Sequence, residues 1–427
     1  MGNNSHKPAI RFQGFTDAWE QRKLGEVFDF LQNNTLSRAE LSLENGVAKN
    51  VHYGDVLIKY GEYLDVTKTE LPFIVSQQVA DKYKGSFLKD GDIIMADTAE
   101  DETAGKCTEI AELKGFPTIS GLHTIPIRPK MKFAKGYLGY YMNSGAYHDQ
   151  LLPLMQGIKV TSISKGALQN TSISFPMDTE EQAAIGKYLI QLDNLITLHQ
   201  RKYEKLLTIK KSMLEKMFPR DGSNNPEIRF IGFTDPWEQR KLGEWCDFIN
   251  GDRSSNYPSA TEFVENGIPF VGSDSLGSTL VDKTKLRFIT TEKYEQMNGL
   301  KIEANDILYT LRGAGFGKCS IADFTGGTVA SSLVGIRCKE ILRSKFLIQW
   351  LCSSNAEHEK NKAVNGSTAQ NISVEDMKKY NVTVPSLAEQ EKISEYLYNL
   401  DNLITLHHLK LEKLKNIKQS LLQNMFV

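Results

Sequence analysis

One block of sequence occurs twice in this chain, and this duplication limits the possible folds more than any other feature. Residues 8–30 read PAIRFQGFTDAWEQRKLGEVFDF and residues 226–248 read PEIRFIGFTDPWEQRKLGEWCDF, with 18 of 23 positions identical. A second pair, LIQLDNLITLH at 189–199 and LYNLDNLITLH at 397–407, follows the same order. Between these blocks the two halves barely align. The sequence therefore predicts two copies of one structural unit that carry different inserts.

Apolar residues at alternating intervals of three and four predict one long helix in each copy. Each helix of about 35 to 40 residues would be roughly 55 Å long, and it could bury its apolar seam only against a partner. We expect the two helices to pack antiparallel, with His199, Lys210, His407 and Lys418 as polar seam positions that set the register. The predicted seam consists of Ile185, Leu189, Leu192, Ile196, Leu206, Ile393, Leu397, Leu400, Ile404 and Leu411.

Short β-rich runs bounded by Gly, Asn, Asp and Pro fill the inserts, together with short helical stretches. The predicted fold class is α+β: two globular α/β domains, separated by two long antiparallel coiled-coil helices and related by a pseudo-twofold internal repeat. The predicted boundaries are 1–178 for the first domain, 179–218 for the first helix, 219–225 for a linker, 226–386 for the second domain and 387–427 for the second helix.

Composition narrows the class of protein. The 427 residues are 40% hydrophobic, yet no apolar run approaches the roughly 18 residues of a membrane helix, and MGNNSHKPAI does not resemble a signal peptide. We expect a cytoplasmic protein without a membrane partner. Five cysteines form no CxxC pattern, which predicts no metal site. A net charge of −1 disfavours a uniformly basic nucleic-acid binder, although residues 201–220 hold seven Lys or Arg against two Glu.

The inserts carry no catalytic motif, so no catalytic residue is predicted. GAGFGKC at 313–319 lacks the first glycine and the final Ser or Thr of a phosphate loop. No methyltransferase tetrapeptide occurs. Asp97 with Glu112 and Lys114 could be drawn as a metal-dependent nuclease site, but the second half has no counterpart, and exposed loop charges are the simpler interpretation.

These features resemble the specificity subunit of Type I restriction-modification systems in their order, their duplication and their spacing. The resemblance rests on two variable domains that each open with GFxxxWEQRKLGE, on a Gly-x5-Ile segment near the end of each, and on a Pro-then-Glu-Gln start to each long helix. It implies a non-catalytic chain in which each variable domain is a target-recognition domain for one half of a split double-stranded DNA site. The helices would act as the spacer.

The resemblance also implies partners. Two methyltransferase subunits would dock around the helices and bind S-adenosylmethionine, and two restriction/translocase subunits would bind ATP and Mg. This chain itself would hold no cofactor, and the complex would be an adenine methyltransferase and endonuclease. Because the two inserts differ, the recognised site should be asymmetric.

Base contacts require donors and acceptors on loops, since the major groove presents a pattern of hydrogen-bonding groups. In the first domain we predict contacts from Lys49, Asn50, His52, Tyr53, Thr98, Glu100, Asp101, Ser120, His123 and Lys159. In the second domain we predict Ser273, Asp274, Ser275, Thr310, Arg312, Lys318, Ser331, Ser332, Thr368 and Gln370. Lysines are expected to position phosphates rather than specify bases.

One alternative from another class stays open: a coiled-coil protein-interaction scaffold that presents two binding modules. Variable inserts on matched frames suit either function. Co-purification with a methyltransferase would distinguish them.

Overall fold

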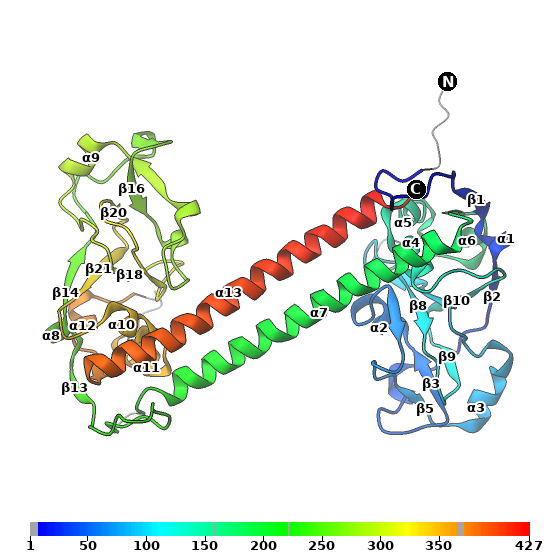
Figure 1. The fold of residues 1–427 in the computed structure, drawn as a ribbon, viewed down its shortest axis with the longest axis horizontal. Coiled ribbons are helices and arrows are strands. Elements are labelled where there is room, and N and C mark those ends of the chain that lie inside the picture. The colour runs from blue at the N-terminus through cyan, green and yellow to red at the C-terminus, as the bar shows by residue number, and fades with distance from the viewer. Residues whose placement is uncertain (1–6, 158, 221–222, 365–370) are drawn as a thin grey trace. The chain divides into compact units, whose positions relative to one another are not determined.

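The computed structural model describes residues 7–157, 159–220, 223–364 and 371–427. It forms two compact units, which we call unit 1 (Met1–His199 and Lys410–Val427) and unit 2 (Gln200–Leu409). Two helices of 38 residues, α7 (Thr179–Lys216) and α13 (Leu387–Asn424), each contribute one segment to each unit (Figure 1). At 1.5 Å per residue, each helix is about 57 Å long.

Unit 1 is organised around a five-stranded sheet. Its strand order is β2 (Phe28–Phe30), β10 (Thr124–Pro129), β6 (Ile93–Ala96), β8 (Cys107–Ala111) and β4 (Tyr63–Asp65). A three-stranded sheet has the order β5 (Phe73–Ile74), β3 (Ala48–Val51) and β9 (Thr118–Ser120), and β7 (Thr98–Ala99) pairs with β11 (Thr161–Ser162). The helices are α2 (Tyr53–Ile58), α3 (Gln77–Lys82), α4 (Tyr137–Asn143), α5 (Gly145–His148) and α6 (Lys165–Gln169), with short 3-10 turns at Arg38–Glu40, Lys84–Ser86 and Leu152–Leu154.

Unit 2 has a four-stranded sheet in the order β14 (Cys246–Asn250), β21 (Leu333–Cys338), β18 (Ile307–Thr310) and β19 (Cys319–Ile321). A second sheet has the order β15 (Phe263–Val264), β17 (Arg287–Ile289), β16 (Ile268–Val271) and β20 (Thr328–Val329). The helices are α9 (Thr291–Gln296), α10 (Ser344–Leu351), α11 (Ser354–Ala363) and α12 (Val374–Lys378), with 3-10 turns at Ala260–Glu262, Ser273–Ser275 and Lys283–Lys285.

The sequence repeat is also a structural repeat. Strands β2, β10, β6 and β8 of unit 1 follow the same antiparallel order as β14, β21, β18 and β19 of unit 2. The second sheets share one parallel pair, β3 with β9 and β16 with β20. One fold therefore occurs twice with different connections, and the predicted fold class is confirmed.

The repeated block closes each unit. Its first strand, β1 (Glu20–Lys23) or β13 (Glu238–Lys241), pairs antiparallel with the strand before the long helix, β12 (Ser172–Phe175) or β22 (Asn381–Val384). A one-turn helix follows, α1 (Leu24–Val27) or α8 (Leu242–Trp245), and its leucine is fully buried. The block thus joins the start of each insert to its end.

The Glu-Gln pair at the start of each long helix fixes that helix to its own unit. Arg11 donates to both carboxylate oxygens of Glu181 at 2.6 and 2.7 Å, and Arg229 donates to both of Glu389 at 2.7 and 2.8 Å. Both glutamates are buried. These arginines lie in the repeated block, so within each unit the block binds the start of the long helix.

Segments of both helices pack within each unit. In unit 1 the seam residues Ile185 and Leu189 of α7 share a core with Met425 and Phe426, at the far end of the chain. In unit 2 the core contains Leu206 of α7 together with Ile393, Leu397 and Leu400 of α13. The start of each helix therefore meets the end of the other, which is an antiparallel arrangement. The remaining predicted seam residues, Leu192, Ile196, Ile404 and Leu411, are buried or half-buried.

The polar seam lysines form ion pairs across the helices. Lys210 binds Asp401 in unit 2, and Lys418 binds Asp193 at 2.7 Å in unit 1. Both aspartates belong to the repeated LDNLITLH sequence. Each also bonds to its own globular domain: Asp193 accepts from Tyr140 at 2.6 Å, and Asp401 accepts from Thr279 at 2.8 Å.

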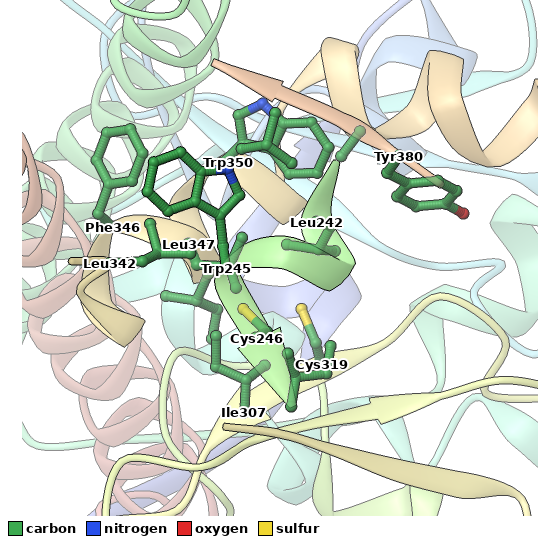
Figure 2. Close-up of a cluster of buried hydrophobic side chains, with 14 of the residues drawn as sticks. Leu242, Trp245, Cys246, Ile307, Cys319, Leu342, Phe346, Leu347, Trp350 and Tyr380 are labelled. Carbon is green, nitrogen blue, oxygen red and sulfur yellow. The ribbon is translucent and has the colours of Figure 1, made fainter. Parts of the chain in front are cut away.

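The repeated block also contributes to the core of unit 2 (Figure 2). Leu242, Trp245 and Cys246 of the block lie among Ile307 of β18 and Trp350 of α10, all buried. The predicted domain boundaries stay a prediction. The first long helix ends at Lys216, before the predicted limit of 218, because a bend and then a proline follow it. The second ends at Asn424, before the predicted limit of 427.

Candidate nucleic-acid interface

The same loops meet at one end of the main sheet in both units. In unit 1, Asp97 after β6 donates its backbone N–H to the His123 carbonyl at 3.1 Å and accepts from Ile163 at 2.8 Å. In unit 2, Leu311 after β18 donates its backbone N–H to the Ser332 carbonyl at 2.9 Å, and its own carbonyl accepts from the Ile372 N–H at 3.0 Å. The Gly-x5-Ile segment is thus tied to the loop after the central strand in each unit, and the side chains there occupy equivalent places.

In unit 2 these loops border a cleft of about 450 Å³. Its lining includes Asn250, Arg253, Leu311, Arg312, Asn371, Ile372, Ser373, Glu375 and Lys378. We call this surface the unit 2 cleft. It is formed by the loop after β14, the loop after β18 and the start of α12.

Two exposed arginines converge in the unit 2 cleft. Arg312 Nη2 and Arg253 Nε donate to the same carbonyl oxygen, that of Ser331, at 2.8 and 3.3 Å. Among the described residues, neither guanidinium lies within 4.0 Å of a carboxylate. Burial and the neighbouring charge of Arg312 lower the pKa of Arg253. The cleft therefore presents uncompensated positive charge with free N–H donors.

The equivalent place in unit 1 has the opposite character. Asp97 Oδ1 accepts from Thr98 Oγ1 at 2.7 Å and lies 3.4 Å from His123 Nδ1. His123 adopts a left-handed backbone conformation with φ of 53°, and its ring meets Tyr53 edge-on at 5.3 Å. These loops of unit 1 thus carry a carboxylate, an imidazole and a phenol, and the residue that corresponds to Arg312 is the neutral Thr98, which follows Asp97 as Arg312 follows Leu311.

The structure places the predicted contact residues unevenly. Glu100, Asp101, His123 and Lys159 of unit 1 are exposed, as are Asp274, Arg312 and Lys318 of unit 2. Lys49, Tyr53, Thr98, Ser273, Ser331 and Ser332 are half-buried. Thr368 and Gln370 lie outside the described residues. For the accessible residues, contact with DNA stays a prediction.

Five predicted contact residues are buried, and their burial argues against base contact. Asn50 accepts from Asn34 at 2.5 Å, His52 caps α2 by accepting from Gly54 at 3.2 Å, and Ser120 bonds Thr124 at 2.6 Å. Ser275 donates to the Lys285 carbonyl at 3.1 Å. Thr310 is fully buried at the end of β18. Strand pairing turns Asn50, Ser120 and Thr310 inward, whereas His52 is buried at the start of α2 and Ser275 in a 3-10 turn.

Lys318 also lies away from the unit 2 cleft. It lines a separate pocket beside Lys211 of α7 and Lys360 of α11. Conversely, sequence reasoning missed Arg253 and Asn371, both of which line the cleft. A signal for Arg253 existed, because it lies five residues after the repeated block ends at Phe248, where the two halves begin to differ.

A second duplicated surface lies on the helices. Leu195 and Leu198 of unit 1 are 46% and 47% exposed, and Leu403 and Leu406 of unit 2 are 44% and 45% exposed. All four belong to the LDNLITLH repeats. We call these two pairs the leucine patches. The two leucine patches are therefore equivalent in sequence and nearly equal in exposure.

Neither a group of metal-binding residues nor a membrane-spanning helix is found in the described parts of the chain. Those residues contain no group of three or more His, Cys, Asp or Glu placed to bind a metal ion. Glu112, which could be drawn with Asp97 and Lys114 as a nuclease site, forms ion pairs with Lys114 and Lys135. No helix among these residues is long and apolar enough to cross a bilayer.

Comparison with known proteins assigns a family to these features. The family model of the Type I restriction modification DNA specificity domain matches twice, at residues 16–208 and 234–416. The chain is 26% identical over 276 residues to the Type I restriction enzyme MjaVIII specificity subunit of Methanocaldococcus jannaschii, covering 62% of this chain and 64% of that protein. It is 25% identical over 418 residues to a protein of the same organism assigned as the MjaX specificity subunit, covering 95% and 92%.

Solved structures show the same fold. The Type-I restriction-modification S subunit from M. genitalium has a TM-score of 0.64 at 14% identity, with 99% of both chains covered. A chain from a study of assembly and conformational transition in the type I R-M system has a TM-score of 0.50 at 19% identity, covering 96% of this chain and 97% of its own.

Proposed function

We propose, since the chain belongs to the family of Type I restriction-modification DNA specificity subunits, that unit 1 and unit 2 each read one half of a bipartite, asymmetric DNA site. The observation that carries this proposal is the repeated loop arrangement with different side chains: Asp97 and His123 in unit 1, Leu311 and Arg312 with Ser332 in unit 2. The same geometry with different hydrogen-bonding groups suits two different base sequences.

The long helices are proposed to set the number of unread bases between the half-sites. Each unit holds a segment of both α7 and α13, so the two helices together connect the recognition domains. The Lys210–Asp401 and Lys418–Asp193 pairs would fix the register of that connection.

We propose that one methyltransferase subunit docks on each leucine patch. The patches are equivalent by sequence and exposure, which favours two copies of one partner. S-adenosylmethionine would be bound by these methyltransferase subunits, and ATP and Mg by two restriction/translocase subunits, while this chain would bind no cofactor. Catalysis is accordingly proposed to reside in the other chains, and the complex in the cytoplasm.

A domain exchange tests the proposed function. Residues 31–177 would be replaced by the corresponding insert of another family member, and the variant expressed with the methyltransferase. Methylome sequencing should then show one half of the recognised site changed and the other half unchanged, because unit 2 is untouched. A change in both halves, or in neither, would contradict reading by separate domains. Failure of the intact chain to co-purify with a methyltransferase would favour the scaffold alternative.

A further inference from the structure

We infer that unit 2 reads a guanine base in its half-site through the Arg253–Arg312 pair in the unit 2 cleft. This inference rests on the proposed function, since it names the base chemistry that one recognition domain selects. It adds a specificity-determining pair of residues, one of which, Arg253, is not among the contact residues predicted from the sequence.

Two observations indicate that the Arg253–Arg312 pair binds a ligand with hydrogen-bond acceptor atoms. The two guanidinium groups share one neutral acceptor, the Ser331 carbonyl oxygen, although each arginine has five N–H donors. Among the described residues, the one other acceptor of either guanidinium is Asn250 Oδ1, 3.4 Å from Arg253 Nη2. Two cations held this close, with no carboxylate of the described residues within 4.0 Å of either, repel each other, and an acceptor group that joins them would relieve this repulsion.

DNA offers two such acceptors, the backbone phosphate and the O6 and N7 atoms of guanine. Comparison of the two units distinguishes them. The counterpart of Arg312 in unit 1 is Thr98, because the preceding residues, Asp97 and Leu311, form the equivalent backbone hydrogen bonds, and Thr98 carries no charge. Phosphates are identical at both half-sites, whereas bases differ. A charged arginine in one unit and a neutral threonine at the equivalent position of the other therefore match the variable part of the DNA, which is the base sequence.

Guanine fits the geometry of Arg312. One of its terminal nitrogens is held by the Ser331 carbonyl, which orients the planar group at the cleft and leaves the other donors available. A fixed guanidinium can donate two parallel hydrogen bonds to O6 and N7, and such pairs discriminate guanine from other bases by about five- to 150-fold. Asn250 and Asn371 beside it add neutral amide groups for neighbouring bases.

The test uses the full complex with its methyltransferase and reads the methylated sequence genome-wide. Arg312→Ala should relax one G·C pair of a single half-site, with discrimination there falling by about five- to 150-fold. That half-site should be the one that stays unchanged in the exchange of residues 31–177. Arg253→Ala should relax the same or the adjacent base pair. Because both arginines are exposed, the complex should assemble with unchanged subunit ratio and thermal stability.

Two further variants separate base reading from phosphate binding. Arg312→Lys keeps the charge but loses the planar fork, so the relaxed recognition should persist. Lys378→Ala, which removes the remaining cation of the cleft, serves as the matched control and should lower methylation uniformly across sites without changing the sequence read. If Arg312→Ala behaves like Lys378→Ala, or if Arg312→Lys restores full specificity, the arginines bind phosphate and the inference is wrong.

The outcomes also distinguish a failure of this inference from a failure of the proposed function. Relaxation at an A·T pair would refute guanine recognition while leaving one domain per half-site intact. Relaxation in both half-sites by Arg312→Ala would instead refute reading by separate domains.

Discussion

At the scale of single residues, one buried ion pair holds each long helix to its globular domain. Glu181 and Glu389 are buried at helix starts, and each receives two hydrogen bonds from an arginine of the repeated block. A carboxylate near a helix N-terminus also offsets the helix dipole. The arginine is needed because a buried carboxylate without a partner is strongly unfavourable.

Arg229→Met should therefore destabilise unit 2 by about 3–5 kcal/mol, because it leaves Glu389 charged and unpaired. The double variant Arg229→Met with Glu389→Gln should recover a large part of this loss, since no buried charge remains. Chemical denaturation followed by fluorescence would measure both. Arg240→Ala is the control: its pairing with Glu238 is exposed, and we expect a change within about 1 kcal/mol. Equal destabilisation by the single and double variants would show that packing, not charge, is lost.

At the scale of secondary-structure elements, the long helices have two distinct faces. One face carries the seam, whose residues enter the cores of the units. The other presents the leucine patches, which remain exposed although leucine is favoured in the interior. Both faces come from the same repeated sequence, LDNLITLH, in which Leu192 and Leu400 are buried while Leu195 and Leu403 are not.

Substituting a leucine patch should remove one methyltransferase. Leu195→Glu with Leu198→Glu should give a complex with one copy fewer, and the same change at Leu403 and Leu406 as well should abolish assembly. Mass measurement by light scattering would report the stoichiometry. Leu207→Glu is the matched control, since it is 42% exposed on α7 but its counterpart at 415 is Lys. A full complement of methyltransferase on the first variant would show that the patches are not the docking surfaces.

At the scale of the whole molecule, the chain passes between the units twice. Unit 1 contains the start of α7 and the end of α13, and unit 2 contains the remainder of each helix. A change in the length of one helix alone would break the pairing of Lys210 with Asp401 or of Lys418 with Asp193. Any change in spacing must therefore lengthen both helices together.

Four residues inserted after His199, together with four after Leu409, would leave each unit intact. Each insertion approximates one helical turn and adds about 6 Å. Because base pairs stack about 3.4 Å apart, the methylated site should gain one or two unread base pairs between unchanged half-sites. Two-residue insertions at the same places would rotate the helix faces by about 200° and should prevent assembly. Methylome sequencing reads the spacer directly, and an active complex with its original spacer would exclude the helices as the ruler.

Sequence alone determined the features that depend on local periodicity and on repetition. The three- and four-residue spacing from Ile185 onward predicts a long helix because side chains at those intervals share one face. The duplicated blocks predict two like domains, because the buried Leu24 and Leu242 must each meet the same surroundings. The family resemblance followed from the order of these blocks.

Tertiary structure alone decided which polar side chains face solvent. Asn50 and Lys49 are neighbours in β3, yet Asn50 is buried and Lys49 is not, since strand pairing sends successive side chains to opposite faces. Arg253 and Arg312 are 59 positions apart in the sequence and share one carbonyl oxygen only because β14 and β18 both pair with β21. Contacts of this kind depend on which strands pair, and the pattern of a single segment does not contain that information.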